Sequence, residues 1–229
     1  MGIPENLEKV KERIEKAALR AGRGGDEIRL VSVTKGVGAE RIIEAARCGA
    51  TTFGENYAQE FRDKHNALEK ILGAEIEWHF IGGIQRNKVK YIVGKISLIE
   101  SLDGVSVAEE INRRAEKLGI RIPVLVQVNT GGEETKGGVE PEQVEDFLIE
   151  MKRFPQIHVK GLMTMPPFFD DPEKARPYFR MLRDLRDKLQ RSFPDLQELS
   201  MGMSADFEIA IEEGATIVRI GTAIFGPRA

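Results

Sequence analysis

The feature that most constrains the fold is an alternation of two hydrophobic patterns between residue 28 and the C-terminus. Short β-branched runs, which are typical of buried strands, alternate with longer segments in which apolar residues recur at helical spacing. The predicted strands cover residues 28–34, 51–53, 76–81, 96–102, 123–129, 157–163, 198–201 and 216–220. The predicted helices between them cover residues 39–48, 57–72, 85–93, 105–118, 141–152, 172–190 and 205–213. This order predicts a parallel sheet covered by helices.

Eight such units in a chain of 229 residues favour a closed barrel. We therefore predict an α/β fold, a single TIM-type (β/α)8 barrel domain that spans residues 1–229. Residues 1–24 contain an additional amphipathic helix, which is expected to pack on the barrel. The alternative is a doubly wound open sheet, which normally carries a G-x-G-x-x-G fingerprint after its first strand. The segment KGVGA at residues 35–39 does not match that fingerprint.

Composition and charge exclude several kinds of partner. The net charge is −3 and acids and bases are mixed along the chain, so no basic face for nucleic acid is expected. No apolar run approaches the length of about 20 residues that a membrane span needs, and the charged N-terminus does not resemble a signal peptide. The protein is therefore expected to be cytoplasmic. The single cysteine, Cys48, lies in a helical pattern and is expected to be a buried structural thiol.

In barrels of this type, functional residues follow the carboxyl ends of the strands. Lys35 ends the first predicted strand, where a partly desolvated amine is a usable nucleophile. From position alone, a solvated lysine at the start of a loop is the more ordinary interpretation. Asn56 follows the second strand, where it either contacts a ligand or caps the next helix.

The loops after the seventh and eighth strands have the composition of a phosphate site. Ser204 precedes a predicted helix, and Gly221 and Thr222 follow the last strand. Backbone N–H groups at a helix start attract an anion, glycine permits its close approach, and hydroxyls add donors. Together with the amine of Lys35, these loops predict a site for a phosphorylated ligand.

Arg219 lies within the apolar run at residues 217–220, where an unpaired charge is costly. If its side chain points into the barrel, it must meet a carboxylate or a ligand acceptor. If it points outward, it pairs with an acid of a neighbouring helix, such as Glu208 or Glu212. The alternation of side chains along a strand leaves both orientations open.

Two other motifs give weaker signals. His79 has no ligand set at metal-binding spacing, so no metal site is predicted, and a hydrogen-bonded core histidine is its ordinary interpretation. The glycine-rich loop at residues 131–138 lacks the Gly-Lys-Ser/Thr of a P-loop. We expect it to be a mobile lid over the barrel mouth, with Lys136 as a rival amine to Lys35.

Six segments, in order, resemble the pyridoxal phosphate homeostasis protein family. They are VSVTK at 31–35, FGENY at 53–57, WHFIG at 78–82, GLMTM at 161–165, SMGMS at 200–204 and RIGT at 219–222. The resemblance implies a barrel like the N-terminal domain of alanine racemase, with pyridoxal 5′-phosphate (PLP) held as a Schiff base on Lys35. It also implies that Ser204, Gly221 and Thr222 hold the phosphate.

The resemblance further implies roles for residues beside the cofactor. Arg219 would face the pyridine nitrogen and disfavour its protonation, which weakens the cofactor as an electron sink. Asn56 and Met201 would also belong to the binding site. The sequence departs from its relatives at Gly83 and Ile84, where bulkier or polar residues are frequent, but the site does not depend on these positions.

Two functions from different classes follow from this resemblance. The first is a non-catalytic carrier and buffer that holds PLP reversibly, with cofactor-accepting apo-enzymes as further partners. The second is an amino-acid racemase, which needs acid–base groups on both faces of the α-carbon. In alanine racemase an additional domain supplies the second base, and this sequence stops at Ala229, so the carrier is favoured. A Schiff-base aldolase using Lys35 ranks last, because it leaves the phosphate site unexplained.

Overall fold

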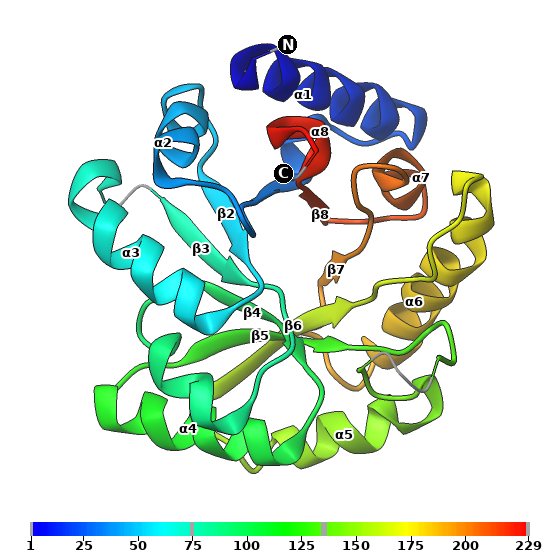
Figure 1. Cartoon of the computed structure of the whole chain (residues 1–229). Coiled ribbons are helices and arrows are strands. Elements are labelled where there is room, and N and C mark those ends of the chain that lie inside the picture. The colour runs from blue at the N-terminus through cyan, green and yellow to red at the C-terminus, as the bar shows by residue number, and fades with distance from the viewer. Residues whose placement is uncertain (1, 74–75, 134–136, 228–229) are drawn as a thin grey trace.

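The computed structural model describes residues 2–73, 76–133 and 137–227. Its strands are parallel and pair in sequence order, and the last strand pairs with the first to close a barrel (Figure 1). The strands are β1 (Arg29–Val33), β2 (Thr52–Glu55), β3 (Glu77–Phe80), β4 (Leu98–Leu102), β5 (Ile122–Gln127), β6 (Ile157–Met163), β7 (Glu198–Ser200) and β8 (Ile217–Ile220). The predicted barrel is confirmed, and the open sheet is wrong.

Helices surround the barrel, as Figure 1 shows in the view along its axis. They are α1 (Ile3–Arg20), α2 (Ala39–Arg47), α3 (Ala58–Leu72), α4 (Val105–Leu118), α5 (Val144–Met151), α6 (Arg176–Leu189), α7 (Phe207–Glu212) and α8 (Thr222–Phe225). Short 3₁₀ helices occupy η1 (Gly25–Glu27), η3 (Pro141–Gln143) and η4 (Pro172–Ala175). None of the helices that the structure describes is both long and apolar enough to cross a membrane.

One predicted helix is wrong in type. Residues 85–93 were expected to be α-helical, but this segment contains a 3₁₀ helix, η2 (Arg86–Tyr91). Its hydrogen bonds span three residues, from Lys88 N–H to Gln85 O and from Ile92 N–H to Val89 O. Val89 and Ile92 are both fully buried. A spacing of three fits the tight 3₁₀ turn, in which side chains three residues apart lie on one face.

Helix α1 packs against α7 and α8, where the chain closes the barrel (Figure 1). Its apolar face recurs at helical spacing and is buried: Ile3, Leu7, Val10, Ile14, Ala17 and Ala18. Two ion pairs join it to α7, from Arg13 to Glu208 and from Arg20 to Glu212, both at 2.8 Å. Helix α1 therefore supports the elements that follow β7 and β8.

The interior of the barrel has an apolar layer and a polar layer. The apolar layer consists of Val31, Leu98, Leu125, Met163 and Ile217. Glu100 and Arg219 lie two residues further along β4 and β8, and side chains two apart on a strand share a face. The polar layer is therefore nearer the carboxyl ends of the strands, and this end is called the mouth below.

Cys48 is a free thiol at the end of α2. It is half-buried and packs against the core, so the expected burial of this thiol is only partial. The C-cap position explains the difference, because a residue there follows the last helical turn and keeps one side open.

Candidate functional site

Most of the predicted site residues line one cavity at the mouth, with a volume of about 300 Å³. The predicted residues in its wall are Lys35, Asn56, Ser204, Arg219, Gly221 and Thr222. Apolar side chains complete the lining: Val33, Ile81, Met165, Phe168, Met203 and Ala205. Met201 is fully buried in the core and lies outside this lining.

Lys35 lies in a turn, two residues beyond the end of β1. The turn is closed by a hydrogen bond of 2.8 Å from Val37 N–H to Thr34 O. Gly36 has φ +71°, a left-handed conformation that favours glycine at the third position of such a turn. Lys35 is half-buried, and its Nζ lies 4.9 Å from the centroid of the Tyr57 ring. This cation–π contact holds the amine against an aromatic face.

Another part of the cavity wall carries hydrogen-bond donors. Within the described chain, the backbone N–H groups of Ser204, Gly221 and Thr222 have no acceptor. The hydroxyl of Ser204 accepts a bond of 3.3 Å from Ala223 N–H, which joins the loop after β7 to the start of α8. Free amides together with hydroxyls suit an anion such as a phosphate.

Arg219 points into the barrel, which settles the orientation that the sequence left open. Its guanidinium donates from Nη2 to Thr164 O at 2.8 Å and from Nη1 to Ser200 Oγ. Glu100 Oε2 lies 3.8 Å from Nη1. Burial lowers the pKa of the Arg219 guanidinium, and the charges of Glu100 and Asp206 oppose that shift. The charge therefore has the carboxylate partner that an inward orientation requires.

Glu100 and His79 form the polar layer that supports Arg219. Both are fully buried, and His79 Nδ1 lies 2.6 Å from Glu100 Oε1. The other Glu100 oxygen accepts from Ser200 Oγ at 2.5 Å. Burial opposes ionisation of Glu100, but His79, Arg219 and Ser200 together outweigh it and keep the pKa of the carboxyl below its usual range. His79 is thus a hydrogen-bonded core histidine, as its sequence context indicated.

Sequence reasoning missed Tyr57 and Glu100. Tyr57 belongs to the matching segment FGENY and to a predicted helix, but its contact with Lys35 was not predicted. Glu100 had a detectable signal, because it is a charged residue inside the apolar run 98–102. The rival amine Lys136 lies outside the described residues. In the part of the chain that is described, no cluster of three or more His, Cys, Asp or Glu is placed to hold a metal ion.

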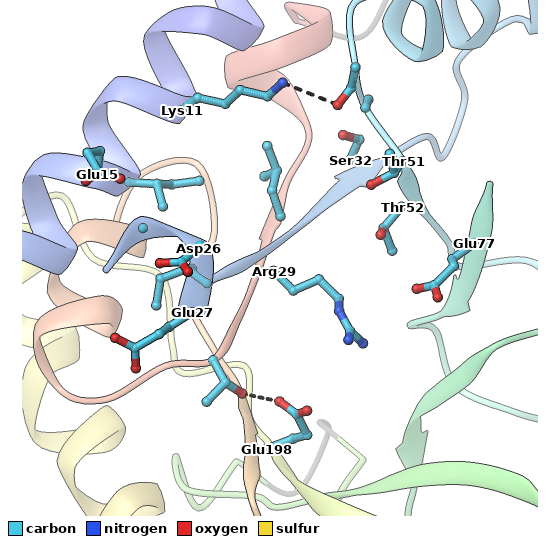
Figure 2. Close-up of a pocket in the computed structure, with 17 residues that line it drawn as sticks. Lys11, Glu15, Asp26, Glu27, Arg29, Ser32, Thr51, Thr52, Glu77 and Glu198 are labelled. Atoms are coloured by element: carbon cyan, nitrogen blue, oxygen red, sulfur yellow. Dashed lines mark hydrogen bonds between the residues drawn. The ribbon is translucent and has the colours of Figure 1, made fainter. Parts of the chain in front are cut away.

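A larger cavity, of about 620 Å³, lies at the opposite end of the barrel, beside α1 and the starts of β1, β2 and β3 (Figure 2). Carboxylates dominate its charged lining: Glu15, Asp26, Glu27, Glu77 and Glu198, against Lys11 and Arg29. Figure 2 shows that Lys11 and Glu198 bond to neighbouring wall residues. Size alone does not identify a site, and it is the mouth cavity that gathers an amine, free amides and a guanidinium.

Comparison with known proteins identifies the family of the chain. Residues 6–229 match the family described as alanine racemase, N-terminal domain. A pyridoxal phosphate homeostasis protein from Aquifex aeolicus is 53% identical over 229 residues, covering 100% of this chain and 99% of the relative. The human protein of the same name is 39% identical over 240 residues, covering 100% of this chain and 87% of the relative.

Solved structures give the same answer. PipY from Synechococcus elongatus with PLP bound has a TM-score of 0.82 and 31% identity, covering 98% of this chain and 100% of that one. Alanine racemase from Clostridium difficile has a TM-score of 0.73 at 17% identity and shares the fold over 99% of this chain and 56% of that one. The family match and the closed parallel sheet thus define a barrel of the alanine racemase N-terminal type. The chain belongs to the pyridoxal phosphate homeostasis protein family.

Proposed function

We propose that this protein binds PLP reversibly through Lys35 and acts as a cytoplasmic carrier and buffer of the cofactor, without substantial catalytic turnover. The observation that carries the proposal is the single cavity lined by both Lys35 and the free donors of Ser204, Gly221 and Thr222. The name of the relatives and the PLP-bound structure of PipY support the choice of ligand. Apo-enzymes that need PLP are the proposed recipients.

The residues of the cavity fit the parts of this cofactor. The amides and hydroxyls of Ser204, Gly221 and Thr222 would hold the phosphate. Asn56 Oδ1 is buried and has no hydrogen-bond partner among the described residues, so a ligand hydroxyl would satisfy it. Met201 is buried outside the cavity lining, and its role in binding stays a prediction.

Arg219 would face the pyridine nitrogen of the bound cofactor. A guanidinium carries only donors and therefore cannot accept the proton of a pyridinium. It would keep the ring nitrogen unprotonated and the ring a weaker electron sink. Such an environment suits storage of the cofactor better than catalysis at the α-carbon of an amino acid.

The aldehyde of PLP supplies an electrophilic carbon when the cofactor is bound. We propose that Lys35 Nζ, in its neutral form, forms a C=N bond with that carbon to give a Schiff base. In this bond formation the amine of Lys35 would give up both of its protons, and the carbonyl oxygen would leave as water. Addition of water would reverse the reaction, so Lys35 would both hold the cofactor and release it.

A PLP-dependent racemase is the second candidate function. Racemisation needs a proton donor and a proton acceptor on opposite faces of the α-carbon. Among the described residues that line the cavity, the titratable side chains are Lys35 and Arg219. Arg219 is engaged with Thr164 and Ser200, so Lys35 alone is left to move a proton. This observation favours the carrier.

The test is an absorbance spectrum of the protein with added PLP, followed by borohydride reduction and peptide mapping. We expect a chromophore in the violet region and a reduced label on Lys35. Lys35→Ala should lose both, while Lys11→Ala, at the opposite cavity, should retain them. A protein that stays colourless with PLP would contradict cofactor binding, and rapid racemisation of a common amino acid would contradict the carrier role.

A further inference from the structure

The two neighbours of Lys35 are held from outside their own turn. Lys64 Nζ donates to Thr34 O at 2.5 Å, and Gly36 N–H donates to Glu60 Oε1 at 2.6 Å. Thr34 O thereby accepts from both Lys64 and Val37 N–H. The backbone is thus tied to α3 immediately before and immediately after Lys35. A turn has no ladder of hydrogen bonds to hold it, so these ties determine where Lys35 leaves the backbone.

The side chains that make these ties form one cluster, which we call the clamp: Glu55, Glu60 and Lys64. Lys64 Nζ lies 2.6 Å from Glu55 Oε1 and 2.7 Å from Glu60 Oε1. Glu60 and Lys64 are one helical turn apart on α3, so both face β1. Glu55 comes from the end of β2 and also accepts from Thr34 Oγ1 at 2.6 Å.

The clamp is a largely buried cluster of charged side chains, unlike an ion pair on the surface. The side chain of Glu55 is fully buried and that of Lys64 is 11% exposed. Burial raises the pKa of the Glu55 carboxyl, and hydrogen bonds from Lys64 and Thr34 offset part of that shift. Buried ion pairs are poor sources of stability compared with apolar packing, but they serve to fix the geometry of the groups they join. All the bonds of the clamp to Glu55 go to Oε1, and Oε2 is buried without a hydrogen-bond partner among the described residues. Loss of Lys64 would leave Glu55 buried without its cation.

We propose that Glu55, Glu60 and Lys64 are positioning residues that aim Lys35 into the mouth cavity. The inference rests on the proposed function, because it concerns the covalent bond between Lys35 and PLP. It does not concern the phosphate site. The loops that carry Ser204 and Thr222 make none of the clamp's hydrogen bonds, so phosphate binding is expected to be independent of it.

Two ligands separate positioning of Lys35 from a general structural role. PLP can bond to Lys35, whereas pyridoxine 5′-phosphate has an alcohol in place of the aldehyde and binds only through the phosphate and ring. Lys64→Met should weaken PLP binding about tenfold or more, since small displacements of reacting groups have effects of this order. The affinity for pyridoxine 5′-phosphate should stay within about twofold, since its contacts lie outside the clamp.

The chain offers matched controls on the same helix. Lys70 lies near the end of α3 and is exposed, so Lys70→Met makes the same chemical change away from the clamp and should match wild type. Lys64→Arg keeps a cation beside Glu55 and Glu60 and should restore part of the PLP affinity. If Lys64→Met fails to fold by circular dichroism, Glu60→Ala takes its place. Glu60 is half-buried, and its loss releases Gly36 N–H.

The outcomes are distinguishable. An equal loss of affinity for both ligands would show a general structural role, and unchanged PLP binding in both Lys64→Met and Glu60→Ala would show no role at all. Either result overturns the clamp while leaving the proposed function in place. If wild-type protein gives no borohydride-trapped label on Lys35, the proposed function fails first, and the clamp falls with it.

Discussion

The two ends of the barrel differ in what their cavities can do. The cavity opposite the mouth is about twice as large, at about 620 Å³ against about 300 Å³. Its charged lining is mainly acidic and lies beside the strand starts (Figure 2). The mouth cavity is smaller but combines an amine, free backbone donors and a guanidinium with a carboxylate behind it.

This difference shows that preorganised polar groups define a site better than volume. At the mouth, a hydrogen bond from Lys64 holds the backbone next to Lys35, and Glu100 lies behind Arg219. Both interactions restrict the groups that would contact a ligand. At the opposite end, Arg29 is exposed. Free energy spent on ordering groups before a ligand arrives is recovered as affinity, and at the mouth the ordered groups are those of the proposed site.

The largest expected difference between the two ends comes from substituting one glycine at each end by alanine. A Cβ on Gly82 would lie 2.2 Å from Asn56 O and 2.7 Å from Asn56 Cα, so Gly82→Ala must displace backbone at the mouth. We expect a loss of about 2–3 kcal/mol in the free energy of unfolding, as overpacking of a tight site causes. PLP binding should fall by more than about tenfold, because a displaced Asn56 moves the cavity wall.

The control lies at the opposite cavity. A Cβ on Gly25 would meet the carboxylate of Glu15, the far end of an exposed side chain that can move aside. Gly25→Ala should therefore change stability by about 0.5 kcal/mol or less and leave PLP binding intact. Chemical denaturation and PLP titration measure both effects. Equal losses in the two variants would remove the distinction between the ends.

The hydroxyls are expected to affect ligand binding without the loss of stability that Gly82→Ala causes. The double variant Ser204→Ala with Thr222→Val removes two donors from the proposed phosphate site and should weaken PLP about 10- to 100-fold, as hydrogen bonds to a charged group do. Binding of pyridoxal, which lacks the phosphate, should not change. Thr51→Val at the other cavity is the control and should match wild type in both titrations. A loss for pyridoxal as large as that for PLP would place the phosphate elsewhere.

The sequence predicts the features that depend on local patterns and misses those that depend on contacts between residues distant in the chain. The strand order, and thus the barrel, follows from local periodicity. The residues that follow the strands lie together at the mouth because the carboxyl ends of parallel strands meet at one end of the barrel. The helix type at 86–91 could not be predicted, because Val89 and Ile92 fit α and 3₁₀ spacing alike. The orientation of Arg219 depended on Glu100, a residue of a distant strand. Lys64 looked like any charged residue of an amphipathic helix.

The smallest expected effect is a pH dependence of opposite sign at the two ends. Asp206, behind the mouth, has a pKa raised by burial, which the bond from Met203 N–H only partly offsets. Glu27, at the other cavity, has a pKa lowered chiefly by the hydrogen bond from Gly24 N–H. Stability from a raised carboxyl pKa is present below the unfolded value and lost as pH rises through the folded one. Stability from a lowered pKa is present above the unfolded value and lost as pH falls.

Substitution by the amide should therefore act in opposite directions. Relative to wild type, Asp206→Asn should be more stable at pH 7 than at pH 3, by about 1.4 kcal/mol for a tenfold rise in the proton affinity of the folded carboxylate. Glu27→Gln should be less stable at pH 7 than at pH 3, by a smaller amount because Glu27 is exposed. Urea unfolding at the two pH values, with carboxyl pKa values from carbon NMR, provides the measurement. If the stability changes between pH 3 and pH 7 had the same sign in Asp206→Asn and Glu27→Gln, burial would not distinguish Asp206 from Glu27. In that case the mouth would be no better ordered than the opposite end.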